Sequence, residues 1–192
     1  MLKMLRQSVV ILVALGVLVG GIYPLAVTGI SQAFFPREAE GSMIVQDAKV
    51  VGSELIGQPF SDPGYFWSRP SATSPIPYNA AASAGSNLGP TNPVLLALVK
   101  ERIESLQAAD SGNIEPVPVD LVTSSASGLD PNISPAAAEY QVARVAGARD
   151  LAVEVVRALV AEYTEGPQWG FLGESRVNVL ELNLALDVMS ER

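Results

Sequence analysis

Hydrophobic and polar positions divide the chain into two very different parts. Between Gln7 and Pro36 no residue is charged, and Ser8–Ile30 is a predominantly apolar run without a polar face. As a helix this run would rise about 34 Å, which matches the roughly 30 Å hydrocarbon core of a bilayer. A buried core helix and a cleaved signal peptide are the alternatives. The length of the run and the lack of a nearby Ala-x-Ala site favour a retained transmembrane anchor.

Residues 31–192 show shorter apolar groups broken by Gly, Pro and polar residues, which is typical of one folded domain. Ser71–Pro93 is by composition a long loop, with disorder as the alternative. We expect one transmembrane helix followed by a single compact α+β domain. Its predicted elements are short strands and turns in Met43–Val51 and Gly57–Ser68, a helix from Asn92-Pro93 to about Gly112, a buried strand at Val119–Thr123, a helix beginning at Ser134, a helix over Leu151–Tyr163 capped by Asp150, and a helix rather than a strand from Asn178.

Glycine spacing within the apolar run indicates a surface for helix contact. Gly16 and Gly20 are four residues apart and Gly21 follows directly, which gives a GxxxG pattern. In membranes such small residues let a second helix approach closely, although glycine is common in membrane helices in general. We interpret the three glycines as a helix-docking face for a partner. Pro24 is expected to kink or end the helix, because it removes one backbone N–H donor.

Charges on either side of the apolar run predict its orientation. Lys3 and Arg6 precede the run, whereas the sequence REAE follows it from residue 37. By the positive-inside rule, residues 1–7 stay in the cytoplasm, 8–30 form the anchor, and 31–192 lie on the extracytoplasmic side. The pattern therefore predicts a single-pass protein of a cytoplasmic (inner) membrane.

The net charge of −8 is concentrated in the predicted domain. Since two of the 12 basic residues, Lys3 and Arg6, precede the apolar run, residues 31–192 hold 10 basic residues against all 20 acidic ones. Such a domain should repel nucleic acid and anionic lipid headgroups. We therefore expect a membrane protein with no nucleic-acid partner, and a mildly raised local concentration of cations.

The chain contains neither Cys nor His, and its only lysines are Lys3, Lys49 and Lys100. Thiol nucleophiles, imidazole bases and zinc sites of the Cys or His type are thereby excluded. The Walker A, G-x-G-x-x-G and G-x-S-x-G patterns are absent as well. We therefore expect no enzyme acting alone, no catalytic residue and no metal site.

The stretch before the helix at Ser134 is the main candidate for ligand or partner contact. Free N–H groups at a helix start attract anions, and hydroxyl-rich turns precede this one. On the helix, Gln141 and Arg144 share a face and are suited to hold a carboxylate, a phosphate or a base edge. The alternatives are a turn that only positions the cap, and a solvated helix face with pairing to Glu139 and Asp150. The candidate nucleotide or partner contacts are Ser127, Gly128, Asp130, Asn132, Gln141 and Arg144.

Arg69 is a further candidate partner contact. It lies between Trp67-Ser68 and Pro70, where stacking on aromatic and proline-rich turns can hold a guanidinium rigidly. Support of the fold is the alternative role.

Several long sequence blocks follow one another along the whole chain. They are YPL from Tyr23, GSELIGQPF from Gly52, YFWSRPSAT from Tyr65, GSNLGPTNP from Gly85, DLVTSSASGLDPNISPAAAEYQVARVA from Asp120 and GFLGESRVNVLELNLALD from Gly170. Together these blocks resemble the C-subunit family of the bacterial Kdp potassium-transporting P-type ATPase. In this family's pattern a His usually follows Asp-Pro, whereas this chain has Asn132, which puts a required histidine at that position in doubt.

The resemblance implies an accessory subunit of an ATP-driven potassium importer. Its implied partners are a channel-like potassium-binding subunit, a P-type ATPase catalytic subunit and a small single-helix subunit, with K⁺ as the ion that the complex transports. The family is also described as a catalytic chaperone that binds ATP and raises the ATP affinity of the ATPase subunit. That role conflicts with the orientation predicted from charge, which places the turn and Gln141 away from cytoplasmic ATP. We therefore expect an assembly role, with nucleotide binding as the alternative.

Overall fold

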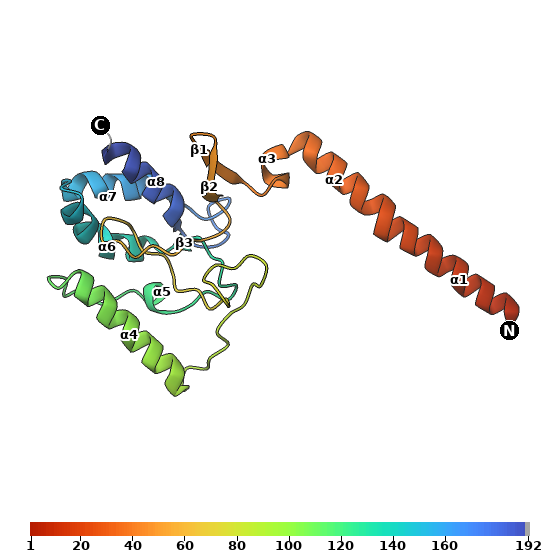
Figure 1. The fold of residues 1–192 in the computed structure, drawn as a ribbon, viewed down its shortest axis with the longest axis horizontal. Coiled ribbons are helices and arrows are strands. Elements are labelled where there is room, and N and C mark those ends of the chain that lie inside the picture. The colour runs from red at the N-terminus through yellow and green to blue at the C-terminus, as the bar shows by residue number, and fades with distance from the viewer. Residues whose placement is uncertain (191–192) are drawn as a thin grey trace. The chain divides into compact units, whose positions relative to one another are not determined.

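The computed structural model describes residues 1–190 and contains two compact units, which divide between Val51 and Gly52. In the first unit, α1 (Leu2–Val17), the π-helix η1 (Leu18–Ile22) and α2 (Tyr23–Phe34) join into one helix of 33 residues (Figure 1). None of its residues is buried within the protein. This helix is long and apolar enough to cross a membrane, and it extends beyond the predicted residues 8–30 at both ends.

The helix continues through Pro24, so the predicted end of the helix at this proline is wrong. In η1, directly before the proline, the N–H of Tyr23 bonds to the carbonyl of Leu18 five residues back. This wider turn changes the backbone pairing beside a residue that has no N–H to donate. The π-turn also contains Gly20 and Gly21, whose lack of a Cβ makes the irregular backbone less costly.

A hairpin follows the short helix α3 (Pro36–Ala39). Its strands are β1 (Met43–Gln46) and β2 (Lys49–Ser53), which confirms the strands predicted in Met43–Val51. Asp47 and Ala48 connect them with φ values of 49° and 60°, as a two-residue turn with positive φ requires. By contrast, residues 57–68 contain turns but no strand, because proline and glycine interrupt any ladder there.

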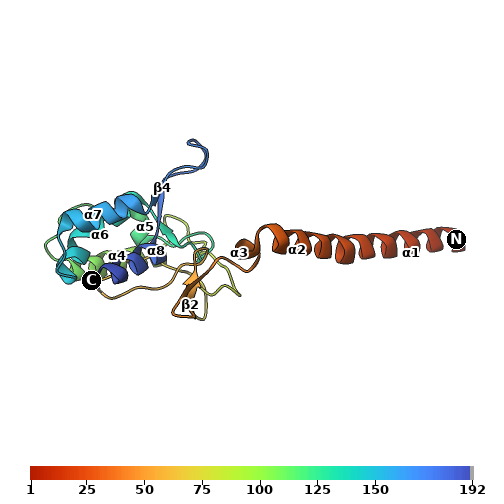
Figure 2. The same ribbon diagram turned by 90° about the horizontal axis from the view of Figure 1, so that it is seen from above.

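The second unit combines helices with a small antiparallel sheet, which confirms the α+β class. The strands lie in the order β3-β5-β4, and Val177 pairs with Ile133 on one side and with Thr164 on the other. The connection between β4 and β5 extends away from the helices and carries the exposed side chains of Trp169 and Phe171 (Figure 2). The elements are α4 (Pro93–Ala109), α5 (Val119–Val122), β3 (Asn132–Ile133), α6 (Pro135–Ala148), α7 (Val153–Glu162), β4 (Thr164–Glu165), β5 (Arg176–Asn178) and α8 (Val179–Ser190).

Helix α6 lies at the centre of the core. Small residues on its inner face let α7 approach closely, and Phe66, from an irregular segment, is completely buried in the same cluster. The buried residues of this core include Ala137, Ala138, Val142, Val145, Val156, Val160, Val177, Leu182 and Leu186.

Side-chain caps fix three of the helix starts as the sequence predicted. Asn92 Oδ1 accepts from the N–H of Val94 at 2.9 Å at the start of α4. Ser134 Oγ accepts from the N–H of Ala137 at 3.0 Å and begins α6. Asn178 Oδ1 accepts from two N–H groups of α8 at 3.1 and 3.2 Å, so this last element is a helix. Each cap satisfies donors that have no partner within the helix.

Two predicted features differ in the structure. Val119–Val122 is a helical turn rather than a strand, because Pro118 begins it and Thr123 Oγ1 donates back to the carbonyl of Val119. Asp150 does not cap α7, whose N-cap is Ala152. Instead Asp150 has a φ of 55° and closes α6, and the following N–H, of Leu151, bonds to the carbonyl of Ala146. This is the pairing that ends many helices at a left-handed residue, a conformation that Asp tolerates.

Candidate functional site

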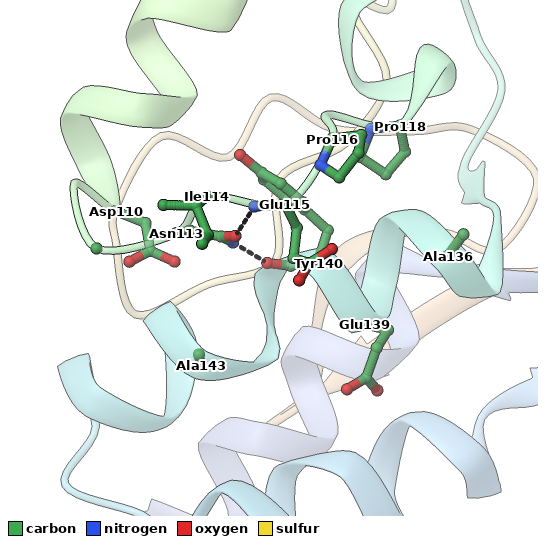
Figure 3. Close-up of a pocket in the computed structure, with 11 residues that line it drawn as sticks. Asp110, Asn113, Ile114, Glu115, Pro116, Pro118, Ala136, Glu139, Tyr140 and Ala143 are labelled. Carbon is green, nitrogen blue, oxygen red and sulfur yellow. Dashed lines mark hydrogen bonds between the residues drawn. The ribbon is translucent and has the colours of Figure 1, made fainter.

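A cavity of about 760 Å³ lies between the loop that follows α4 and one face of α6 (Figure 3). Asp110 ends α4, and Tyr140 comes from α6. Asn113 connects the two elements, since its Nδ2 donates to the carbonyl of Tyr140 at 3.0 Å. No role was expected for Asp110, Asn113 or Tyr140, because the first two lie outside the quoted blocks and Tyr140 lies in a block that indicated only the family. The cavity is lined by Asp110, Gly112, Asn113, Ile114, Glu115, Pro116, Pro118, Ala136, Glu139, Tyr140 and Ala143.

Gln141, a predicted contact residue, is buried on another face of α6. Its Oε1 accepts from the N–H of Trp67 at 2.7 Å, and its Nε2 donates to the carbonyl of Trp67 at 3.2 Å. The amide thus pairs with the backbone of Trp67 much as a neighbouring strand would. Its Nε2 also donates to the carbonyl of Ala137. The side chain is 1% exposed, so the alternative of a solvated helix face is wrong.

Arg144 completes the same network. One Nη donates to the carbonyls of Pro63 and Tyr65 at 2.5 and 3.1 Å, and the other donates to Gln141 Oε1 at 2.6 Å. The guanidinium carbon also lies 4.7 Å from the ring centre of Trp67. Burial lowers the pKa of Arg144 to about 10, so the side chain remains charged at neutral pH. Arg144 is therefore positioned to hold residues 62–67, termed the clamped segment below.

Helix α8 also holds the clamped segment. Its Asn183 exchanges two hydrogen bonds with the backbone of Phe66, at 2.8 and 3.0 Å. Arg149, at the end of α6, donates to the carbonyl of Gly64 at 2.5 Å and forms an ion pair with Asp187 of α8 at 2.8 Å. Side chains from two helices thus satisfy a partly buried, irregular backbone that no strand accompanies.

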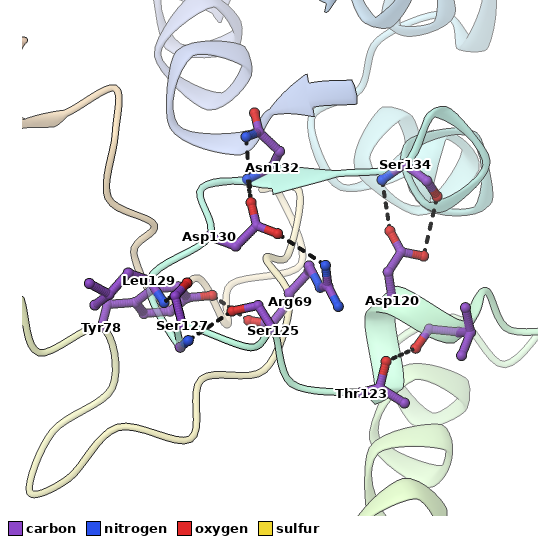
Figure 4. Close-up of polar contacts among 12 residues, drawn as sticks. Arg69, Tyr78, Asp120, Thr123, Ser125, Ser127, Leu129, Asp130, Asn132 and Ser134 are labelled. Atoms are coloured by element: carbon purple, nitrogen blue, oxygen red, sulfur yellow. Dashed lines mark hydrogen bonds and ion pairs between the residues drawn. The ribbon is translucent and has the colours of Figure 1, made fainter. Parts of the chain in front are cut away.

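The predicted turn at 127–132 is satisfied by its own side chains (Figure 4). Ser127 Oγ accepts from the N–H of Leu129 at 3.1 Å, and Asp130 Oδ1 accepts from the N–H of Asn132 at 3.0 Å. Gly128 has a φ of 68°, and a Cβ there would come within 2.6 Å of the carbonyl oxygen of Ala84. The two hydrogen bonds are those of a turn closed by its own Ser and Asp side chains.

Arg69 is paired inside the protein. Its Nη1 lies 3.0 Å from Asp130 Oδ2, so the structure brings two of the predicted contact residues together. The hydroxyl of Tyr78 donates to the carbonyl of Arg69, and burial raises the pKa of this hydroxyl to about 12. Arg69 therefore contacts the turn through its guanidinium and Tyr78 through its backbone carbonyl (Figure 4).

A carboxylate of the chain itself occupies the start of α6. Asp120 Oδ2 accepts from the N–H of Ser134 at 2.7 Å, and Asp120 Oδ1 accepts from the Ser134 hydroxyl at 3.2 Å (Figure 4). An anion is favoured at such a helix start, and α5 supplies one. The sequence did not reveal this contact, because Asp120 precedes Ser134 by 14 residues and belonged to a predicted strand.

In the first unit, the helix leaves the predicted docking face open. A Cβ added at Gly16, Gly20 or Gly21 would meet no atom within 4 Å. The three positions therefore offer room for close contact with another helix.

Comparison with known proteins identifies the family. A family model described as K⁺-transporting ATPase, c chain, matches residues 5–188. A protein of Dechloromonas aromatica is 61% identical over 191 residues, 100% of both chains. One of Methylococcus capsulatus is 60% identical over 98% of this chain and 100% of its own. One of Polaromonas naphthalenivorans is 63% identical over 98% of this chain and 96% of its own.

All three relatives are named potassium-transporting ATPase KdpC subunit. That name describes a subunit of a complex, in agreement with the prediction that the chain is not an enzyme on its own. The resemblance found in the sequence blocks is confirmed over almost the whole length. The chain therefore belongs to the KdpC family, the c chain of the K⁺-transporting ATPase.

Proposed function

We propose that the chain is a non-catalytic accessory subunit that stabilises an ATP-driven potassium import complex. Its helix Leu2–Phe34 anchors it in the bacterial cytoplasmic membrane, with residues 1–7 in the cytoplasm and residues 31–192 outside. There the acidic domain assists the channel-like potassium-binding subunit and favours the entry of cations. Membership of the family, the apolar helix and the charges that flank it support this assignment.

The observation that carries the assembly role is the anchor helix itself. From Gln7 to its end the helix carries no charged residue, none of its residues is buried within the chain, and its glycine face is open. We propose that Gly16, Gly20 and Gly21 contact helices of the channel-like, P-type ATPase and single-helix subunits. Because lipid and side chains are equally apolar, close backbone approach is what favours such an association.

Replacement of both Gly16 and Gly20 by Leu tests this docking face. The control is Ala26→Leu, which adds similar bulk per site on a side of the helix away from all three glycines. We expect the double variant to lower the amount of partner subunits that co-purify, while the control retains them. If the natural chain, the double variant and the control all co-purified with equal amounts of the partner subunits, the result would contradict the proposed docking face.

Labelling of a single introduced cysteine tests the orientation, since the chain has no native thiol. Ala126 is exposed and close to the turn, so Ala126→Cys provides the site. A thiol reagent that cannot cross the inner membrane should label it in cells whose outer membrane is permeabilised. Labelling only after the inner membrane is opened would place the domain in the cytoplasm.

Nucleotide sensing is the second candidate, which the family's description as a catalytic chaperone implies. The contacts of Gln141, Arg144 and Asp120 weigh against a nucleotide at the start of α6, since all three bond within the chain. Calorimetry of the full-length chain with Mg-ATP tests it. Saturable heat that Gln141→Glu abolishes would favour this role, and no heat at millimolar ATP would reject it.

A further inference from the structure

Two residues that line the cavity beside α6 each carry a buried polar atom without a hydrogen-bond partner among the described residues. These atoms are Asp110 Oδ2 and the hydroxyl of Tyr140. Tyr140 is only 9% exposed, and both residues line the cavity. A buried polar atom with no partner is unfavourable, and native proteins contain few of them. These two atoms therefore indicate a ligand that brings hydrogen-bond donors.

The charges around the cavity select a cation. None of the residues that line it is basic, whereas Asp110, Glu115 and Glu139 are acidic. Glu139 is already paired, since Arg157 lies 2.8 Å from its Oε1. Arg144 interacts electrostatically with Asp110, but its guanidinium N–H groups donate to the clamped segment and to Gln141. Asp110 thus remains an acceptor without a donor.

The other walls of the cavity are apolar and suit a hydrocarbon stem. Pro116, Pro118, Ala136 and Ala143 line it, and Ile114 at its edge is 95% exposed. Figure 3 shows Tyr140 on α6 facing the loop that carries Asn113 and Glu115. A volume of about 760 Å³ falls within the range typical of small-molecule sites. The described residues hold no group of three carboxylates able to bind a metal ion, which favours an organic cation over a bare one.

We propose that this cavity binds a primary alkylammonium group. The ammonium donates to Asp110 Oδ2 and to the hydroxyl of Tyr140, and its methylene stem lies against Pro116 and Ala136. The group can come from a free diamine or from a lysine side chain of a partner protein, because both present the same chemistry.

Calorimetry of the full-length chain in detergent with 1,5-diaminopentane tests the site. The neutral analogue pentan-1-ol, which keeps the stem and lacks the charge, should not bind measurably. We expect Asp110→Asn to weaken diamine binding by roughly tenfold or more, since it removes a charge-assisted hydrogen bond. Tyr140→Phe should weaken it by a smaller factor. Glu104→Gln is the matched control, because it removes an exposed carboxylate of α4 and should leave binding unchanged.

Two further measurements distinguish the sources of the amine. Binding of Nα-acetyl-lysine methylamide, together with loss of partner subunits from the Asp110→Asn complex, would assign the site to a partner's lysine. Binding of the diamine with an intact Asp110→Asn complex would assign it to a free amine. The proposal is overturned if neither amine binds at millimolar concentration, or if Asp110→Asn binds as tightly as the natural chain. Circular dichroism of each variant verifies that it is folded. Either of the two outcomes that overturn the amine site would leave the test of the glycine docking face unaffected.

Discussion

Two faces of α6 use their polar groups in opposite ways. On one face Gln141 and Arg144 are buried, and their polar groups bond to the clamped segment and to each other. On another face Tyr140 is buried as well, yet its hydroxyl has no partner among the described residues. Buried polar groups that are matched hold a fold together, whereas unmatched ones indicate a missing ligand. Burial alone therefore does not tell a structural residue from a binding residue.

The face of α6 that carries Gln141 and Arg144, termed the matched face, should be the more sensitive of the two faces to substitution. Gln141→Leu removes the partners of the Trp67 backbone and leaves one Arg144 donor without its acceptor, all in the interior. We expect a loss of about 3 kcal/mol in the free energy of unfolding, since each unsatisfied buried group costs roughly 1–3 kcal/mol. Urea unfolding of the full-length chain measures it. Gln107→Leu, at an exposed position of α4, should change stability by less than about 0.5 kcal/mol.

The second substitution tests whether geometry or charge matters at Arg144. Arg144→Lys keeps the charge but cannot donate to Pro63, Tyr65 and Gln141 in the same planar arrangement. We expect urea unfolding to show a loss of about 2 kcal/mol in the free energy of unfolding, which is close to the net contribution of one or two hydrogen bonds to a charged donor. Retention of full stability by the lysine variant would show that the charge alone suffices.

The half-buried Tyr78 extends the comparison to pH. The hydroxyl of Tyr78 bonds to the carbonyl of Arg69, and burial raises its pKa from 10.0 to about 12. The unfolded chain loses this proton first, so the stabilisation is complete below pH 10 and is lost as the pH rises through about 12. Phenolate absorbance should show one tyrosine ionising near that upper value, and Tyr78→Phe should abolish this step. If the absorbance of the natural chain and of Tyr78→Phe instead diverged between pH 9 and 10, Tyr78 would have an ordinary, solvated hydroxyl.

The smallest change in the free energy of unfolding is expected on the face of α6 that carries Tyr140, termed the unmatched face. Tyr140→Phe removes a buried hydroxyl that has no hydrogen-bond partner within the described residues, while the ring keeps its packing. Its free energy of unfolding without added amine should stay within about 0.5 kcal/mol of the natural chain, or rise slightly. A loss comparable to that of Gln141→Leu would mean that the hydroxyl has a structural partner, and the distinction between the two faces would fail.

Local sequence predicted the helices well, because their signals lie within a few residues. Asn92, Ser134 and Asn178 cap the helices they were expected to cap. The apolar run forms the expected long helix, since no polar face limits it. Asp150 was misread for a related reason: its type suits both the start of one helix and the left-handed end of another. Only the backbone conformation decides between the two.

The contact residues were harder to predict, because their partners lie far away along the chain. Gln141 and Arg144 were recognised as a pair on one helix face, but their partner backbone is 74 to 81 residues away. Arg69 was expected to contact another protein, and the structure pairs it within the chain with Asp130, 61 residues on. Asp110 and Tyr140 are 30 residues apart and carried no chemical signal in the sequence, and the cavity that both line exists only after the chain has folded.

The sequence by itself determined the membrane-spanning helix, its flanking charge, the positions of the helix caps and the family to which the chain belongs. These depend on hydrophobic length, on hydrogen bonds between near neighbours and on residue identity, none of which needs a distant contact. The tertiary structure alone decided which polar side chains are buried, which of them find partners, and where a cavity remains. Desolvation and hydrogen bonding depend on which distant segments fold against one another, and a local pattern does not contain that information.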